Sequence, residues 1–223
     1  MNRKHSSERG NSILEFALVA SLFLVPMLAG SYTMGMALVK MLQVGQVARD
    51  ANILVVRGID LSQSDNQSLV VKTASGLGMN VAGSNTPSTS GLGVVILTTI
   101  RLVSGTDCAA QGYAASGTLA DGEPNYPTCP NFLKYVFTQR IVIGNSAKLT
   151  SVTGNPGDTL ASNGTLSAAQ YVTDTVDQAQ GFPGLVTLTE GTNAYIAESA
   201  FDISAMNVFA TPQMGIIYAR NIS

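Results

Sequence analysis

The feature that most constrains this chain is an apolar run near its N-terminus. From Phe16 to Val39 the chain runs for 24 residues without a charged side chain. A helix of about 20 apolar residues is long enough to cross the hydrocarbon core of a bilayer. The apolar region of a secretory signal peptide is shorter, about 7–15 residues, and ends in a small-x-small cleavage site that "MLAGS" does not supply. The run therefore predicts a membrane-spanning helix rather than a cleaved signal peptide.

Basic residues precede the run and set the expected orientation. Arg3, Lys4 and Arg9 stand at the start of the chain, ahead of the apolar segment. Positive charge next to a membrane span stays on the cytoplasmic side. We therefore expect a single-pass protein with its N-terminus in the cytoplasm and the residues after Lys40 outside it.

Beyond Lys40 the apolar pattern narrows to one side of a helix. Apolar residues recur there at spacings of three and four, which is typical of a helix with one buried stripe; they are Met41, Val44, Ala48, Ala51 and Val55. We expect one helix over residues 11–57 that leaves the membrane and lays this stripe on the domain it carries. The expected organisation is a cytoplasmic leader over 1–10, the transmembrane and extended helix over 11–57, and an extracytoplasmic domain over 58–223.

The rest of the chain contains helical and strand-like segments. A helix is predicted over 65–77, with Asp65 as its cap, and a shorter one over 166–181, with Ser167 as its cap. Runs rich in β-branched residues predict strands, of which the first two are expected to pair antiparallel; they occupy 92–103, 135–144, 184–191, 193–203 and 214–223, the last as a closing edge strand. The predicted fold is α+β, with an antiparallel sheet in a small domain attached to the long helix.

Composition and charge narrow the function classes. Only 12% of the residues are charged, the formal net charge is −2, and Lys and Arg are scattered. Without a basic cluster, the chain lacks the electrostatic footprint of a nucleic-acid-binding protein. Both cysteines, Cys108 and Cys129, lie in the part expected outside the cytoplasm, where an oxidising compartment favours a disulfide. We expect them to be bonded to each other.

Catalytic and metal-binding patterns are scarce in the sequence. The single histidine is His5, in the expected leader, and neither a P-loop nor a G-x-S-x-G motif occurs. We therefore expect no enzymatic activity, no cofactor and no metal. Asp121 and Glu123 offer hard oxygen ligands of the kind that calcium takes, but turn formation explains them more simply. Asp174 and Asp177 are expected on the solvated face of the predicted helix.

An acidic residue stands at the edge of the apolar run. Glu15 is the fifth residue after Gly10, which Asn11 follows directly. This Gly-x-x-x-x-Glu arrangement ahead of an apolar segment resembles the processing signature of type IV prepilins and pseudopilins. The wider stretch "RGNSILEFALVASLFLVPML…GQVARDA" is similar to the TadE-like family of tight-adherence (Flp, type IVc) pilus systems. The similarity covers residues 9–57.

The resemblance implies a processed minor pilin or pseudopilin. A prepilin peptidase would cut between Gly10 and Asn11 on the cytoplasmic face, and Glu15 would neutralise the N-terminal amine of a neighbouring subunit and set the register between subunits. A charged group inside a bilayer costs about 2.5–3.5 kcal/mol on insertion scales, so such a residue usually has a partner and a role. The implied partners are the peptidase, other pilin and Tad assembly subunits, and membrane lipid. The implied location is the bacterial inner membrane, with incorporation into the extracellular pilus as a further expectation.

Two alternatives remain open. Glu15 lies near the cytoplasmic interface, so a hydrated carboxylate without a partner is also compatible with its position. The whole chain also fits an unprocessed single-span envelope protein, whose extracytoplasmic domain binds a ligand or partner. In that case the loops over 108–129 or 145–164 would carry the contacts.

Overall fold

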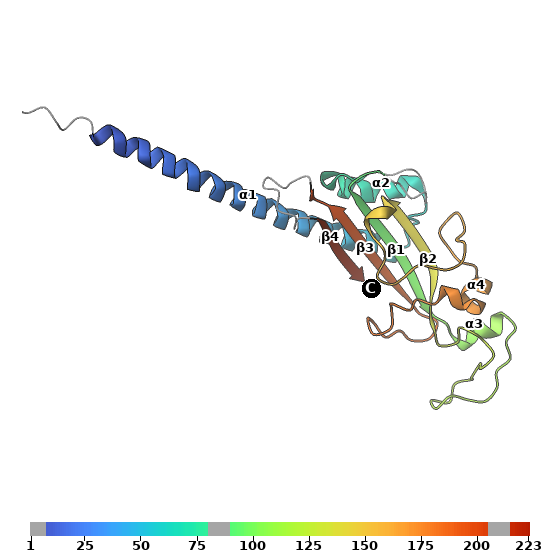
Figure 1. The fold of residues 1–223 in the computed structure, drawn as a ribbon. Helices are drawn as coiled ribbons and strands as arrows, with labels where there is room; N and C mark the ends of the chain where they lie inside the picture. The colour runs from blue at the N-terminus through green and yellow to red at the C-terminus, as the bar shows by residue number, and fades with distance from the viewer. Residues whose placement is uncertain (1–7, 80–89, 205–214) are drawn as a thin grey trace, which may run out of the picture.

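One long helix joins the N-terminal part of the chain to a small domain (Figure 1). The computed structural model describes residues 8–79, 90–204 and 215–223, so residues 1–7 of the expected leader lie outside it. Helix α1 spans Glu8–Val56, 49 residues, and continues through Pro26. Its N-terminal part extends away from the domain, whereas its C-terminal part lies against the sheet. The helix predicted over 11–57 is thereby confirmed.

The domain is built on a four-stranded antiparallel sheet in the order β2-β1-β3-β4. The strands are β1 (Gly93–Leu102), β2 (Tyr135–Gly144), β3 (Asn193–Asp202) and β4 (Ile216–Ile222). Strand β1 is paired along both edges and buried on both faces, which explains why its sequence is almost unbroken by charge. The sheet agrees with four of the five predicted strands, with the antiparallel pairing of the first two and with the edge position of the last. Helices and sheet together make the fold α+β.

The predicted strand over 184–191 was wrong. This described segment forms turns and irregular backbone. Both edges of β1 are already paired, by β2 and by β3, so the segment finds no open edge there. A β-branched composition indicates that a segment suits a pleated surface, but it does not say whether a partner strand is available.

The C-terminal part of α1 packs on one face of the sheet. Val44, Val47 and Ala51 are buried there, in one cluster with side chains of α2 and of three strands; the strand members include Val95, Leu97, Ile141, Ile143, Ala197 and Phe201. The predicted stripe is therefore largely confirmed. Met41 is the exception, at 56% exposed, because it lies where α1 leaves the sheet.

Two polar contacts fix α1 along the sheet. Ser199 Oγ on β3 donates to the carbonyl oxygen of Val44 at 3.1 Å. Further along the helix, Asn52 Nδ2 donates to Asn221 Oδ1 on β4 at 2.5 Å. Because hydrogen bonds have narrow distance and angle requirements, these two contacts define the axial position of the helix, which apolar packing alone specifies less well.

Helix α2 (Ser64–Thr73) follows α1 and packs beside it. Val70 faces the shared core, and a short 3-10 turn, η1 (Ser75–Leu77), carries the chain to the end that was predicted for this helix. The predicted cap was wrong: Gln63 takes the cap position without a side-chain bond, and Asp65 lies in the first turn. A carboxylate in that turn still interacts favourably with the helix dipole.

The opposite face of the sheet is covered by the long segment between β2 and β3. Its helix α4 (Ala168–Thr173) has the predicted cap, because Ser167 Oγ accepts from Gln170 N at 3.2 Å and Gln170 Oε1 accepts from Ser167 N at 2.9 Å. The helix predicted to 181 ends earlier, since Asp174 is extended. The carbonyl of Asp174 accepts instead from Asn131 Nδ2 at 2.9 Å.

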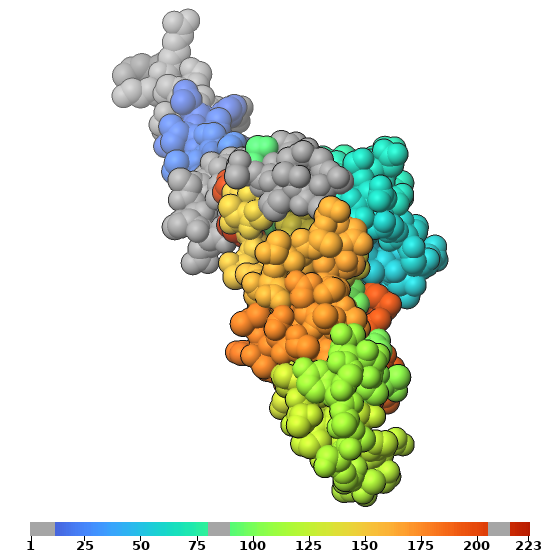
Figure 2. Space-filling model, turned by 90° about the vertical axis from the view of Figure 1, so that its right-hand side faces the viewer, coloured from blue at the N-terminus to red at the C-terminus, as the bar shows by residue number. Residues whose placement is uncertain are grey.

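The two ends of the sheet lie at different distances from the free part of α1. Ser199 meets α1 at Val44, whereas Asn221 meets it at Asn52, so one end points toward the N-terminal part of α1. We call this the near end; it carries Gly93, Gly144, Asp202 and Ile216. The far end carries Leu102, Tyr135, Asn193 and Ile222. Helix α3 (Gly105–Ala110) and the loop after it project from the far end, opposite α1 (Figure 2).

Gly93 offers a test of the packing at the near end. A Cβ added at Gly93 would lie 2.1 Å from the Phe201 ring, which is fully buried. Gly93→Ala should therefore lower the free energy of unfolding by about 1–3 kcal/mol, because an overpacked core must shift side chains or backbone. The measurement is denaturant unfolding of the full-length protein in detergent, followed by circular dichroism.

The matched control is Gly45→Ala in α1. A Cβ at Gly45 meets nothing within 4 Å. Alanine favours a helix over glycine by about 0.5–1 kcal/mol, so this variant should be at least as stable as the wild type. Equal unfolding free energies for the two variants would contradict the placement of Phe201 over Gly93.

Candidate functional site

The N-terminal part of α1 presents apolar side chains that the domain does not cover. Phe16 is 75% exposed and Met27 is 72% exposed. By length and composition, α1 is a helix able to cross a membrane, and its most apolar stretch is not buried in the protein. Apolar surface of this extent is unfavourable in water, so it calls for lipid or another protein. The described chain thus contains an N-terminal helix of the kind that the apolar run predicted.

The three residues of the predicted processing signature lie close together on this helix. The peptide between Gly10 and Asn11 falls within the first turn of the helix as described, which begins at Glu8. First-turn amides lack intrahelical acceptors, and helix ends open at little cost. Glu15 is exposed, and no described residue forms a salt bridge with it. Its carboxylate is therefore available to a group outside this chain.

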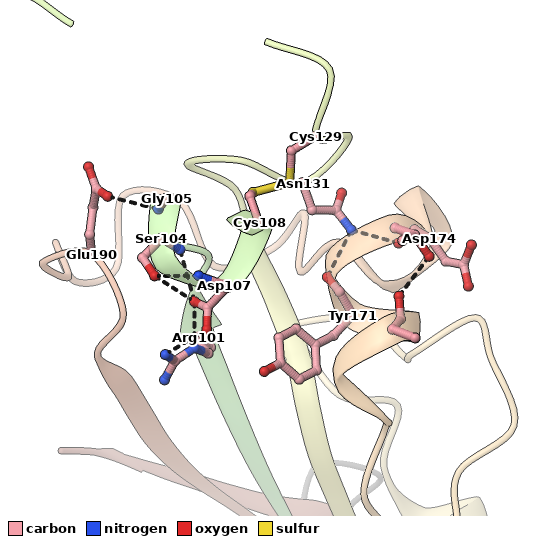
Figure 3. Close-up of a disulfide and its surroundings, with 12 residues drawn as sticks. Arg101, Ser104, Gly105, Asp107, Cys108, Cys129, Asn131, Tyr171, Asp174 and Glu190 are labelled. Atoms are coloured by element: carbon pink, nitrogen blue, oxygen red, sulfur yellow. Dashed lines mark hydrogen bonds and ion pairs between the residues drawn. A yellow bond between two sulfur atoms is a disulfide. The ribbon is translucent and has the colours of Figure 1, made fainter. Parts of the chain in front are cut away.

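The cysteines form the predicted disulfide at the far end of the sheet (Figure 3). Cys108 lies in α3 and Cys129 in the loop that precedes β2, with their Cα atoms 5.9 Å apart. Both are buried, and they pack with Val103, Val136 and Val172. The bond closes the loop that carries Asp121 and Glu123 and ties it to the sheet.

A charged cluster that the sequence analysis missed holds α3 next to the disulfide (Figure 3). Arg101 on β1 donates from Nε and Nη2 to the two oxygens of Asp107, both at 3.0 Å. Asp107 Oδ2 also accepts from Ser104 N at 3.0 Å, while Ser104 Oγ accepts from Asp107 N at 3.2 Å, which makes a capping box. The Ser-x-x-Asp spacing before α3 was a usable sequence signal.

The surroundings of Asp107 change its acidity. Burial by itself raises the pKa of this carboxyl, but the hydrogen bonds from Arg101 and Ser104 outweigh it and leave the pKa below its usual value. The same pairing raises the pKa of Arg101. The cluster therefore stays charged at neutral pH and fastens α3 to the end of β1.

A polar cleft of about 700 Å³ lies beside this cluster. Its lining includes Arg101, Glu123, Tyr126 and Glu190. Gly105 lets the Tyr126 ring approach, because a Cβ there would lie 2.6 Å from it. Since Arg101 is occupied by Asp107, the charged groups left to a ligand are carboxylates. The cleft thus suits a polar or cationic group rather than an anion.

The paired acids of the sequence have structural roles. Asp121 Oδ1 accepts from Glu123 N at 3.1 Å, which is the turn expected there. The expectation for Asp177 was wrong: it is fully buried rather than solvated, and its Oδ1 accepts from Gly157 N at 2.9 Å and Asp158 N at 3.0 Å. Among the described residues, no three His, Cys, Asp or Glu side chains are arranged to hold a metal ion.

A second missed cluster holds the loop segment and β4 to the sheet. Glu198 on β3 is fully buried and accepts from Ser151 Oγ, from Val152 N at 3.1 Å and from the Tyr218 hydroxyl at 2.8 Å. Burial and the Glu198 carboxylate raise the pKa of Tyr218, which keeps its proton on the hydroxyl that donates. Arg140 lies nearby and donates to the carbonyl oxygen of Gly154 at 2.5 Å. No sequence signal distinguished Glu198 from an exposed strand residue.

No protein-family model, curated protein or solved structure matches this chain. The function is therefore inferred from the chain's own residues: the apolar helix, the residues at its start and the two ends of the domain. None of these features forms a catalytic constellation in the described part of the chain.

Removing the disulfide should lower stability without changing the fold. The bond joins cysteines 21 residues apart. Cross-linking a loop of this length restricts the unfolded chain and is worth about 3 kcal/mol. The double variant Cys108→Ser/Cys129→Ser leaves no unpaired thiol and should lose about that free energy of unfolding in denaturant titrations. An unfolding midpoint identical to the wild type, with or without reductant, would contradict a structural bridge.

Asp107→Asn should weaken the anchoring of α3 by about 1–2 kcal/mol at neutral pH, because it removes a charged cap and a two-point ion pair. Asp121→Asn, in the exposed turn, is the matched control, and it should change stability by less than about 0.5 kcal/mol.

The difference should also depend on pH. Because the folded-state pKa of Asp107 is depressed, its contribution is complete above the unfolded pKa of about 3.9 and is lost as the pH falls through the folded value. Unfolding curves of wild type and Asp107→Asn should therefore converge below about pH 4. A constant difference down to acid pH would contradict a charged Asp107.

Proposed function

We propose that this protein is a TadE-like minor pilin or pseudopilin that acts in assembly of a tight-adherence pilus. The observation that carries the proposal is the Gly10–Asn11–Glu15 arrangement directly ahead of an apolar helix that the domain leaves uncovered. In this proposal a prepilin peptidase removes residues 1–10 in the cytoplasm. The apolar helix then holds the subunit in the inner membrane until assembly, with the domain outside.

Cleavage creates a positive charge that can pair with the Glu15 carboxylate. A new α-amino group at Asn11 has an ordinary pKa of about 7.7–8.0 and is largely protonated at neutral pH. A cation from a neighbouring subunit next to Glu15 offsets the cost of holding the carboxylate in the bilayer. The pairing also gives neighbouring helices one preferred axial register. Apolar contacts between helices do not by themselves select one register, because they are nearly equally favourable at many axial positions.

The exposed surface of α1 is suited to contact with other helices. Gly30 and Gly35 are open positions, where an added Cβ meets nothing within 4 Å. Ser31 and Gly35 form a small-x-x-x-small pair, as do Ala17 and Ser21. Small residues at this spacing let helix backbones approach closely in a membrane. The proposed partners are accordingly other pilin and Tad assembly subunits, in addition to the peptidase and lipid.

The polar cleft at the far end favours a second candidate function. In that alternative the chain is not processed, α1 is a permanent anchor, and the domain binds a ligand or partner through the cleft lined by Glu123, Tyr126 and Glu190. The two functions differ in whether the peptide bond between Gly10 and Asn11 is cut. A mature chain that still begins at Met1 belongs to the anchored receptor, and one that begins at Asn11 belongs to the pilin-like subunit.

The N-terminus of the mature protein decides between them. Mass spectrometry of membrane fractions should find a chain starting at Asn11 when the host's prepilin peptidase is present, and one starting at Met1 when it is deleted. Retention of Met1 in both strains would overturn processing.

Glu15→Ala tests the role of the carboxylate after cleavage. The variant should be cut normally but recovered poorly with assembled filaments, because the neighbouring amine has lost its partner. Leu14→Ala, which is also exposed on α1, is the matched control and should assemble like the wild type. Equal recovery of the two variants would contradict the register role of Glu15.

A further inference from the structure

The near end of the domain lies at the depth where α1 leaves the membrane. A span that starts at Phe16 and crosses the hydrocarbon core in about 20 residues ends near Gly35. The helix meets the sheet from Val44 onward, so residues 36–43 cover only about 12 Å along the helix axis. This distance is comparable to the headgroup layer of a bilayer. The near end of the sheet is therefore next to the membrane surface, and the far end points away from it.

An apolar groove opens at this place between α1 and the start of β4. It has a volume of about 450 Å³. Its lining comes from α1, from the residue after β3 and from the start of β4, and it is almost entirely apolar; it includes Met34, Leu38, Met41, Ile203, Ile216 and Ile217. Several of these side chains remain exposed, Ile216 at 53% and Met41 at 56%. The groove continues the uncovered apolar surface of α1 onto the domain.

Tyr218 stands at the edge of the groove, and its ring is directed to the face of the sheet opposite α1, where Glu198 lies. Its hydroxyl donates to the buried Glu198 at 2.8 Å, while 40% of the residue stays exposed. Tyrosine is enriched at membrane–water interfaces, where its ring meets apolar chains and its hydroxyl finds a polar partner. The ring is therefore held beside the groove rather than inside it.

The charges of the two ends differ in sign. Near the near end, Lys40 donates to the carbonyl of Gly76, Lys72 lies one turn before Gly76, and Lys148 pairs with Asp202 at 2.7 Å. Three cations thus stand there against Asp202 and the buried Glu198. The far end carries more acids than bases. Asp107 is paired there with Arg101 and Asp177 is buried, while Glu123 and Glu190 line the cleft and Asp174 and Lys134 lie nearby. Basic groups beside apolar surface are attracted to anionic headgroups.

We propose that the near end of the domain rests on the bilayer, with phospholipid of the outer-facing leaflet in the groove between α1 and β4. An acyl chain contacts Leu38, Met41 and Ile216, and the lysines lie at the level of the headgroups. A second copy of the protein fits less well, because its own near end would bring like charges together. The proposal rests on the membrane span of the proposed function and adds a lipid-binding surface on the domain.

The chain contains no tryptophan, so a single introduced tryptophan reports its own surroundings. Three exposed positions sample three environments: Leu22 in the apolar run, Ile216 at the groove and Val176 toward the far end, at 63%, 53% and 60% exposed. The full-length variants Leu22→Trp, Ile216→Trp and Val176→Trp are reconstituted in vesicles of phosphatidylethanolamine and phosphatidylglycerol. Fluorescence is compared with and without bromine on the acyl chains.

The expected result is that bromine quenches the tryptophans at positions 22 and 216 and leaves the one at position 176 unchanged. The emission maximum at position 216 should also be blue-shifted relative to position 176. A different result would be quenching at position 22 with no more quenching at position 216 than at position 176. In that case α1 spans the bilayer, but the domain does not contact lipid and the inference is wrong. If position 22 is not quenched, α1 does not span the bilayer, and the inference, which depends on that span, is wrong as well.

The amount of protein in the vesicles separates lipid from a second copy. Quenching at position 216 should not depend on the protein-to-lipid ratio if phospholipid occupies the groove. Quenching that disappears as the ratio rises would show that another copy covers the groove, which would overturn the inference. Cleavage after Gly10 is read independently by mass, so failure of processing is distinguishable from failure of lipid contact.

Discussion

The structure depends on the contact between the C-terminal turns of α1 and the four-stranded sheet. One continuous helix serves two environments: its first part is apolar on all sides, and from Val44 onward only one stripe is apolar. That stripe covers a sheet face that would otherwise expose Leu97, Ala197 and Phe201 to water. Because Ser199 and Asn52 add hydrogen bonds at separate points, the helix also determines which end of the sheet lies toward its uncovered apolar part.

The other face of the sheet is held by a different kind of interaction. Long loops with little regular structure cover it, and a buried backbone of this kind must find hydrogen-bond partners. Glu198 and Asp177 supply them, each with a buried carboxylate that accepts from backbone amides of the loop segment. Each carboxylate thereby holds the covering segment against the core. The disulfide does the same for the loop at the far end, together with Tyr113, Tyr126 and Phe132, which pack around it.

The division into two ends gives the proposed function a spatial arrangement. The near end combines an apolar groove with lysines, and the far end combines a polar cleft with carboxylates. In the proposed function, this polarity would direct the far end to the exterior while the helix stays among lipids or other helices. Such an arrangement serves a pilin-like subunit and also the anchored alternative, because both need the domain oriented relative to the membrane.

The features that arise from local patterns could be predicted from the residues alone. The apolar run, the stripe beyond Lys40, the cap at Ser167, the pairing of Cys108 with Cys129 and four of the strands could all be predicted, since each depends on composition or on spacing along the chain. The strand over 184–191, the cap at Asp65, the extent of the helix over 166–181 and the solvated Asp177 were wrong.

These points became clear only in the folded chain, because each depends on which distant groups meet. Glu198 meets Ser151 across 47 positions of sequence, and the groove joins α1 to a strand near the other end of the chain. A residue's partners across space determine whether it is buried, charged or exposed, and no local periodicity contains that information.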